Sequence, residues 1–350
     1  AQKERPFDKL RVDGYVGKGE INRSWQGMKR LLFALGIAAC SISASIAQTP
    51  TAPSPGEIVA AAPATDWTTI AASDLLVMDL VPGPRGPRRV VIQLMPVPIS
   101  AGWVRNIRKL ADAGWWDGTS INRVQDNYVV QWGDATEKKP LPDAMETMTE
   151  ADYVSPAVAK ALLDHMILQA TRDNGHSAGK PEPSKPDMAD AYAAGGAFLN
   201  GWPLAIGSVQ QGNTWPVHCY GMVGVGRNLS PDTGSGAELY AVIGHAPRHL
   251  DRNIALVGRV IEGIEHLSSL LRGTGPLGFY EKEEERVPIL SARIGTEIAD
   301  LPTFEYLSTD SRSFATYADA RANRRDPFFI RPAGGADICN IPVPMRRAVP

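Results

Sequence analysis

The chain has 350 residues, of which 43% are apolar and 21% are charged, as expected of a folded protein with at least one sizeable core. Its 36 Lys and Arg residues nearly balance its 38 Asp and Glu residues, which argues against a dedicated nucleic-acid surface. Three cysteines without paired spacing exclude a disulfide-stapled scaffold and a zinc site, so packing must stabilise the fold.

The sequence predicts a secretory signal peptide over residues 28–47. Met28-Lys29-Arg30 gives a basic start, residues 31–39 are apolar, and Ser45-Ile46-Ala47 fits a small-x-small cleavage site. A transmembrane anchor would need roughly 20 apolar residues, more than this segment offers, so we expect no stable membrane span. Residues 1–27 would then lie upstream of the natural start as a start-site artefact. The expected location is the periplasm.

Two features of the amino-terminal region bear on processing. Ile37-Ala38-Ala39-Cys40 is similar to the lipobox at which bacterial lipoproteins are cleaved and acylated, so a lipoprotein anchored through Cys40 is the alternative. If cleavage follows Ala47 instead, only Cys219 and Cys339 remain, and an oxidising compartment allows them to form a disulfide. Residues 48–70, rich in Pro, Ala, Thr and Ser at their start, are predicted to be a linker.

The folded part is predicted to begin near Ala71 and to be mainly β. Period-2 alternation or β-branched runs predict strands at residues 88–95, 126–131, 218–225, 238–243, 253–257 and 287–294. A helix capped by Ser100 is predicted to end at Gly114. A second helix is predicted from Val260 to Gly273. This order suggests a closed barrel capped by two helices.

Two blocks of the sequence resemble the cyclophilin family of peptidyl-prolyl cis-trans isomerases. The first, residues 88–134, reads RRVVIQLMPVPISAGWVRNIRKLADAGWWDGTSINRVQDNYVVQWGD and carries the family's order of strand, helix, aromatic-DGT, x-x-Arg-Val and Gln-x-Gly-Asp. In the second block, GAELY at 236–240, Leu250-Asp251 and VGRVIEG at 257–263 are similar to family segments. The resemblance implies a closed eight-stranded antiparallel barrel with two capping helices.

The resemblance defines one domain with additions. The cyclophilin-like domain covers residues 71–296, with its core at 71–134 and 215–295. An insertion at 135–214 separates the two halves of the core and contains a helix predicted near residues 155–171. A carboxy-terminal extension covers 297–350, where residues 319–331 are charged and predicted to be helical.

The resemblance also implies a peptidyl-prolyl isomerase that needs no cofactor and no metal. Arg123 matches the catalytic arginine, because a guanidinium remains a donor and can reach the imide nitrogen as it pyramidalises. The other residues that match substrate-binding positions are Tyr128, Val129, Gln131, Glu238, Tyr240, His249 and Leu250. The expected partners are proline-containing unfolded or partly folded polypeptides, and the chain is expected to be a monomer.

Two positions depart from the family pattern. Glu238 replaces a glutamine, and its carboxylate is free to pair with Arg123 and either orient it or hold it away from substrate. Ile254 replaces a common pocket histidine. The sequence therefore leaves two functions open: an isomerase acting on secreted or envelope proteins, and a cyclophilin-like binding module or chaperone with little or no turnover.

Overall fold

A computed structural model describes residues 51–96, 98–176, 188–207 and 212–349. The predicted signal peptide and Cys40 lie outside the described residues. The strands of the barrel are β2 (Leu75–Gly83), β3 (Gly86–Leu94), β4 (Ser120–Val124), β5 (Val129–Gly133), β9 (Met222–Val225), β10 (Leu239–Val242), β11 (Leu256–Glu262) and β12 (Val287–Ile294).

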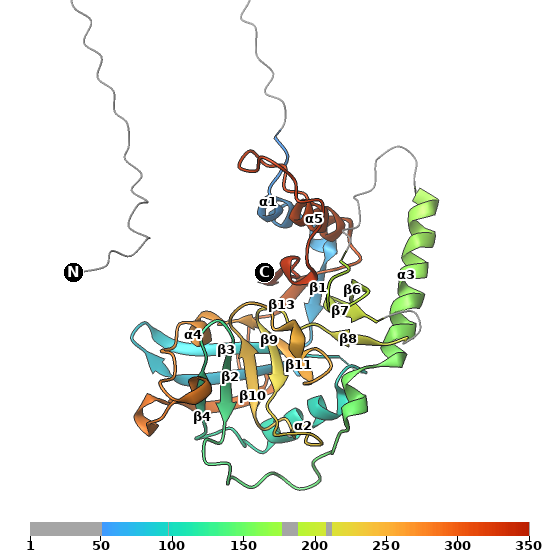
Figure 1. Ribbon diagram of the computed structural model, residues 1–350. Helices are drawn as coiled ribbons and strands as arrows, with labels where there is room; N and C mark the ends of the chain where they lie inside the picture. The colour runs from blue at the N-terminus through green and yellow to red at the C-terminus, as the bar shows by residue number, and fades with distance from the viewer. Residues whose placement is uncertain (1–50, 97, 177–187, 208–211, 350) are drawn as a thin grey trace, which may run out of the picture. The chain divides into compact units, whose positions relative to one another are not determined.

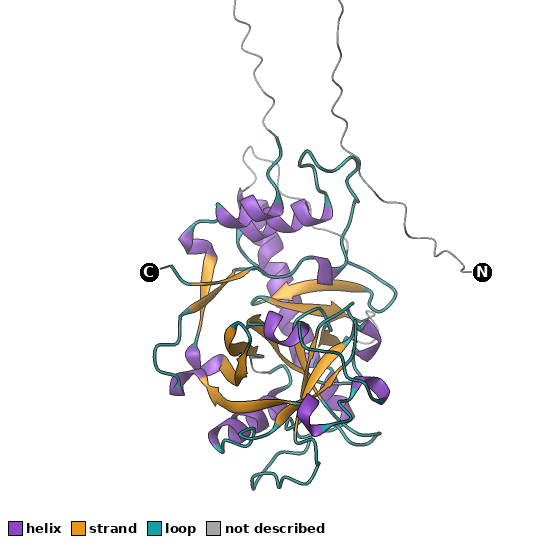
Figure 2. Cartoon of the chain, turned by 90° about the vertical axis from the view of Figure 1, so that its left-hand side faces the viewer, coloured by secondary structure: helices purple, strands orange, loops and turns teal. Residues whose placement is uncertain are grey.

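These strands form a closed antiparallel barrel in the order β10-β5-β4-β12-β2-β3-β11-β9 (Figures 1 and 2). The ring closes because β9 pairs with both β10 and β11. The interior is filled by the alternating side chains that the sequence indicated, among them Val90, Ile92 and Leu94. The family fold predicted from the sequence is therefore confirmed.

The first capping helix, α2 (Ala101–Asp112), buries Trp103, Ile107 and Leu110 in the barrel core. It ends before Gly114, which has φ +59° and so adopts a left-handed conformation that favours glycine. The start differs from prediction. Ser100 precedes the helix, but it is itself left-handed at φ 50°, and its side chain does not bond to the first turn.

The second predicted helix is much shorter than expected. Residues 260–262 belong to β11, where Val260 pairs with Ile92 and Glu262 with Val91 across a β-bulge. Only α4 (Glu265–Ser268) is helical, and Leu271 is 84% exposed. The prediction of a helix from Val260 was wrong because ladder hydrogen bonds to β3 extend the strand past the point where the apolar spacing becomes helical.

The insertion forms its own small sheet and a long helix. Its elements are α3 (Pro156–His176), β6 (Gly195–Leu199) and β7 (Trp202–Ile206), and the sheet is completed by β8 (Thr214–Pro216), which runs from the last residue of the insertion into the second half of the core. Val158 and Leu162 of α3 are buried in the main core. The buried guanidinium of Arg259 on β11 donates to the Gly201 carbonyl at 2.6 Å, so the β6–β7 turn is bonded to the barrel.

The segment predicted to be a linker is ordered where it pairs with the extension. Residues 55–60 form α1 (Pro55–Ala60), which Ser54 and Glu57 close with a capping box. β1 (Trp67–Ile70) joins β13 (Phe304–Leu307) and β14 (Met345–Arg347) in a three-stranded sheet. The linker prediction was therefore wrong at these elements, because Pro-rich composition does not reveal a strand partner far along the chain.

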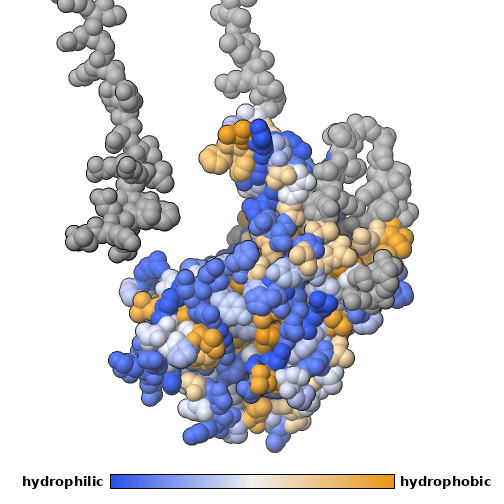
Figure 3. Space-filling view, in the orientation of Figure 1, coloured by the Kyte–Doolittle hydropathy of each residue, from blue (hydrophilic) through white to orange (hydrophobic). Residues whose placement is uncertain are grey.

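The helix of the extension lies earlier than predicted. α5 (Arg312–Ala322) begins where the Ser311 hydroxyl accepts the Phe314 N–H at 3.0 Å, and it buries Phe314, Tyr317 and Ala318. Residues 323–331, predicted to be helical, are not, and Pro327 disfavours helix at the residue before it. In Figure 3 an apolar patch covers the segment after α5, where Phe328 and Ile330 are 85% and 95% exposed.

Candidate active site

The predicted site residues meet in a cleft of about 710 Å³ on the barrel. Ile254 lines it, as do seven of the eight residues assigned to catalysis or substrate binding. These seven are Arg123, Tyr128, Val129, Gln131, Glu238, Tyr240 and Leu250.

Strand register explains why these residues converge. Arg123 of β4 is paired with Gln131 of β5, and Gln131 in turn is paired with Tyr240 of β10. Val129 and Gln131 are two residues apart, so they lie on the same face of β5. The period-2 pattern of three neighbouring strands therefore builds the wall of the cleft.

Arg123 is held by three side-chain hydrogen bonds. Its Nε donates to the Leu277 carbonyl at 2.7 Å, Nη1 to Gln131 Oε1 at 3.2 Å, and Nη2 to Gln125 Oε1. Its Cζ also lies 5.3 Å from the ring centre of Phe279. Burial lowers the pKa of Arg123, but a guanidinium stays protonated in proteins, so the group remains a fixed donor.

Glu238 and Arg123 both form hydrogen bonds with Gln131. Burial raises the pKa of Glu238 to about 7, against the effect of hydrogen bonds from Asn122, the Asp134 backbone N–H and Gln131. Gly133 makes room for it, since a Cβ there would lie 1.9 Å from a carboxylate oxygen. Among the described residues, the donors of Arg123 go to Leu277, Gln131 and Gln125, and it forms no ion pair with Glu238. The direct pairing that the sequence allowed is thus replaced by a link through Gln131.

The ionisation of Glu238 predicts a pH-dependent stability. Its folded pKa of about 7 exceeds the usual value of 4.5, so the folded state holds more protons than the unfolded state between these pH values. The free energy of unfolding should therefore fall as pH rises from about 4.5 to about 7, by about 1 to 3 kcal/mol. Denaturant titrations at several pH values should show this fall for the wild type and a smaller one for Glu238→Gln. Equal slopes would contradict the assignment.

The apolar pocket is a small cluster separate from the barrel interior. Val129, Tyr240 and Val242 are buried in it, and Tyr128 and Ile254 pack against them. Arg123 Cζ lies 5.7 Å from the ring centre of Tyr128, so the fixed donor borders this apolar surface. The arrangement suits a small apolar ring with a polar bond beside it.

His249 and Leu250 belong to a 3₁₀ turn, η4 (Arg248–Leu250), and only one of them reaches the cleft. Leu250 lines it. His249 does not line the cleft and is exposed, but its ring stacks on Tyr128 with centroids 6.3 Å apart and planes 12° apart. The structure thus places His249 outside the cleft, in contact with the cleft residue Tyr128.

Cys219 and Cys339 are joined by a disulfide with a Cα–Cα distance of 5.1 Å. This is the pair expected from the sequence. Cys219 lies between β8 and β9, and Cys339 lies in the short 3₁₀ turn η8 (Ile338–Asn340) of the extension. The bond therefore ties the extension to the second half of the barrel.

Three contributors to the site were missed by sequence reasoning. Leu277 and Phe279 come from the loop between α4 and β12, and Phe279 pairs with Arg123 through an isolated β-bridge. His218, which was not among the predicted site residues, lies 2.8 Å from the Tyr240 hydroxyl through its Nε2. The first two lie in a Gly-rich loop with no periodic signal, and a single histidine before a strand carries no motif.

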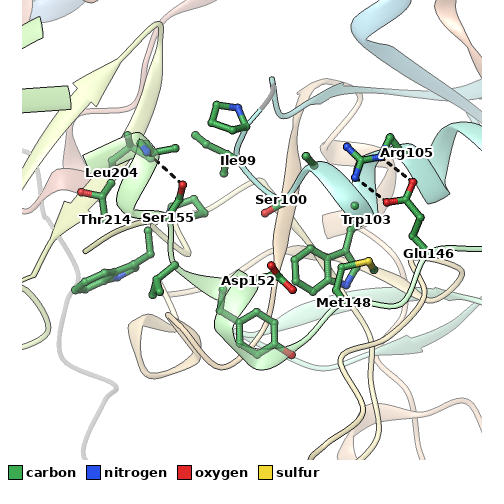
Figure 4. Close-up of a pocket in the computed structure, with 18 of the residues that line it drawn as sticks. Ile99, Ser100, Trp103, Arg105, Glu146, Met148, Asp152, Ser155, Leu204 and Thr214 are labelled. Atoms are coloured by element: carbon green, nitrogen blue, oxygen red, sulfur yellow. Dashed lines mark hydrogen bonds and ion pairs between the residues drawn. The ribbon is translucent and has the colours of Figure 1, made fainter. Parts of the chain in front are cut away.

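A second pocket, of about 300 Å³, lies where the insertion meets the start of α2 (Figure 4). Trp103 stacks on Tyr153 at 5.6 Å, and Arg105 forms a bidentate pair with Glu146 at its rim. It shares no lining residue with the cleft around Arg123. None of the residues assigned to catalysis or substrate binding lies in it.

The comparisons with known proteins identify the family. The family model described as cyclophilin type peptidyl-prolyl cis-trans isomerase/CLD matches residues 88–294, more than half of the chain. The chain therefore belongs to this family: it is a peptidyl-prolyl cis-trans isomerase, and its domain binds proline-containing peptides. No curated protein matches the sequence.

A solved structure from Hirschia baltica shares the fold. A crystal structure of a cyclophilin from Hirschia baltica aligns with a TM-score of 0.58 and 22% identity, covering 80% of this chain and 92% of that one. A cyclophilin type peptidyl-prolyl cis-trans isomerase from Cryptosporidium parvum, crystallised with the dipeptide ala-pro, aligns with a TM-score of 0.33 and 11% identity over 63% of this chain and 98% of that one.

Among the described residues, no helix is long and apolar enough to cross a membrane.

Proposed function

We propose that this chain accelerates X-Pro isomerisation in secreted or envelope proteins and that Arg123 stabilises the twisted imide. One observation carries the proposal: a guanidinium fixed by three hydrogen bonds borders an apolar pocket of the character that a proline ring requires. Tyr128, Val129, Tyr240 and Leu250 would hold the ring. Gln131 would bond to the substrate backbone and steady Arg123.

The chemistry needs only rotation about one bond. Resonance gives the amide before proline a rotation barrier of roughly 18 to 20 kcal/mol. As the bond twists, the nitrogen pyramidalises and its lone pair becomes an acceptor. A donor held at that nitrogen stabilises the transition state more than either ground state, and this difference raises the rate. No covalent bond forms or breaks, so neither nucleophile nor proton transfer is required.

A protease-coupled isomerisation assay on a proline tetrapeptide tests the proposal directly. The wild type should shorten the slow phase, which takes about 10 to 100 s without catalyst. The Glu238→Gln variant should stay within about threefold of the wild type, because Glu238 acts on Arg123 only through Gln131 and threefold corresponds to about 0.6 kcal/mol. A wild type without turnover would overturn the proposal.

The second candidate function is a peptide-binding module or chaperone with little or no turnover. Glu238 and Ile254 favour it, since both replace polar residues common at these positions in the family. Under this alternative the peptide binds while the wild-type rate stays at background, and Glu238→Gln gains activity strongly. The same assay, run beside a peptide-binding titration, therefore separates the two functions.

The proposed clients follow from the expected export of the protein. Cleavage after Ala47 would yield a mature, monomeric periplasmic protein that begins at Gln48, and an oxidising compartment would support the Cys219–Cys339 disulfide. Amino-terminal sequencing of protein from the envelope fraction should find Gln48. Palmitate labelling at Cys40 would indicate a lipoprotein instead, and cytoplasmic protein with residues 1–27 intact would overturn the export proposal.

A further inference from the structure

A chain of hydrogen-bonded buried side chains leads away from the apolar pocket. It starts at Tyr240, and its other members have been given no role so far. The hydroxyl of Tyr240 is 2.8 Å from His218 Nε2, and His218 Nδ1 is 2.8 Å from Asp251 Oδ1. All three side chains are buried, His218 completely. Tyr240 is the one member of this chain that also lines the cleft.

The hydrogen bonds assign the tautomer of His218. Asp251 accepts from Arg248 Nε at 2.8 Å and from the His218 backbone N–H at 3.0 Å. Burial opposes its charge, but hydrogen bonds from His218 and Arg248 hold the pKa of Asp251 below its usual value. An ionised Asp251 only accepts, so His218 carries its proton on Nδ1. Nε2 then accepts from the Tyr240 hydroxyl.

Burial also lowers the pKa of His218, which favours the neutral ring that this arrangement requires. The hydroxyl of Tyr240 is therefore a donor with a fixed acceptor below the pocket. The ring planes of Tyr240 and His218 are nearly parallel, 11° apart, with centroids 6.3 Å apart.

Gly224 completes a slot for the hydroxyl. A Cβ at this position would lie 2.3 Å from the Tyr240 oxygen, so only glycine lets the hydroxyl pass over β9. With the oxygen held there, Tyr240 presents apolar ring to the cleft. A tyrosine can thus serve at a site that binds an apolar proline ring.

The same chain continues into the insertion. Arg248, which is 4% exposed, also bonds to Asp190 and lies over the ring of Tyr192 with its Cζ 5.2 Å from the ring centre. Asp190 and Tyr192 belong to the insertion at 135–214. Arg248 is also 3.5 Å from Asp337 of the extension. Asp251 is thus fixed by an arginine that the insertion itself anchors.

We propose that His218 is a positioning residue for proline binding, acting through the Tyr240 hydroxyl, and that Asp251, Arg248 and Asp190 make the insertion a support for the pocket. The inference rests on the proposed function, because it assigns the groups that shape the site where the proline ring would bind.

A double-mutant cycle on the full chain tests the inference. His218→Asn keeps a donor near Asp251 but is too short to reach Tyr240, whereas His218→Gln keeps an acceptor near the hydroxyl. Each is made in the wild type and in Tyr240→Phe. The readouts are KM and kcat on a proline tetrapeptide, the Kd of the same peptide, and the melting temperature.

We expect His218→Asn to raise KM and Kd about tenfold, as is typical when a buried donor loses its partner, with a smaller change in kcat. His218→Gln should have a clearly smaller effect. In the Tyr240→Phe background, where no hydroxyl needs an acceptor, His218→Asn should change KM by less than about twofold. A merely structural role for His218 would give the same loss in both backgrounds, and that result would overturn the inference.

The insertion is tested by Asp190→Ala beside Asp164→Ala, which removes the carboxylate of an exposed pair with Lys160 on α3. Asp190→Ala should raise KM about threefold and Asp164→Ala should leave it unchanged. Equal KM values for Asp190→Ala and the wild type would overturn the role of the insertion. A wild type that neither binds nor isomerises the peptide would overturn the proposed function itself. An active wild type in which His218→Asn and Tyr240→Phe have additive effects would overturn only the inference about His218.

Discussion

Replacing Arg123 by alanine is expected to lower kcat/KM about 10²-fold or more, because losing one preorganised donor to a transition state costs roughly 2.7 to 4 kcal/mol. The guanidinium is oriented by Leu277, Gln131 and Gln125, so its donors are in place before substrate binds. Arg123→Lys should recover little, since an ammonium cannot make the same set of bonds in one plane. The measurement is kcat/KM in the coupled assay.

The control for this prediction is Arg272→Ala. Arg272 pairs with Asp126 at 2.9 Å beside the β4–β5 turn, outside the cleft lining. Its removal should change kcat/KM by less than about twofold, because exposed ion pairs contribute little. Both variants should keep the wild-type melting temperature within a few degrees. If Arg123→Ala keeps both its melting temperature and the wild-type rate, the catalytic group lies elsewhere.

The barrel and most of the cleft could be predicted because their signals are local. In a strand such as β3, the alternation of apolar residues identifies the buried face from only a few positions. Arg123 and Gln131 lie eight residues apart on one hairpin. The spacing within such a hairpin fixes which side chains meet. Family resemblance could therefore bring these residues together without knowledge of the rest of the fold.

What could not be predicted depends on contacts between distant segments. β1 is a strand because β13 pairs with it, and Thr68 and Thr69 give no sign of that partner. Leu277 and Phe279 reach Arg123 from a loop more than 150 residues away. The composition of residues 67–70 favoured a linker, and the pairing with β13 makes them a strand. The loop that holds Leu277 and Phe279 remains a loop, but its contacts with Arg123 bring it to the site.

The departures from the family pattern also needed the structure. The sequence indicated that Glu238 could hold Arg123 directly, but hydrogen bonds from Asn122, Gln131 and Asp134 engage it instead. Tyr240 brings a hydroxyl to the border of an apolar pocket. Its hydroxyl turns out to bond to His218, below the pocket. In both cases the buried group's partner decides its role, and that partner lies on another strand or loop.

Replacing both Cys219 and Cys339 by alanine is expected to lower the free energy of unfolding by roughly 4 to 5 kcal/mol, less any strain relieved. The bond closes a loop with a sequence separation of 120 residues, and the chain-entropy model assigns a large cost to leaving such a loop open. Denaturant titration should show the loss. Wild type unfolded without reductant should show no free thiol at either position, and two free thiols there would contradict the bond.

The reduced protein should nevertheless fold, because the extension has anchors of its own. β14 pairs with β13, β13 pairs with β1 outside the extension, and Arg347 forms a bidentate pair with Glu262 of the barrel. Hydrogen exchange of the double cysteine variant should therefore show β14 amides still protected under native conditions. If those amides exchange freely while the barrel amides stay protected, the disulfide alone holds the extension in place. Losing the disulfide would then release the residues near η8 locally and would not lower the free energy of unfolding of the whole protein.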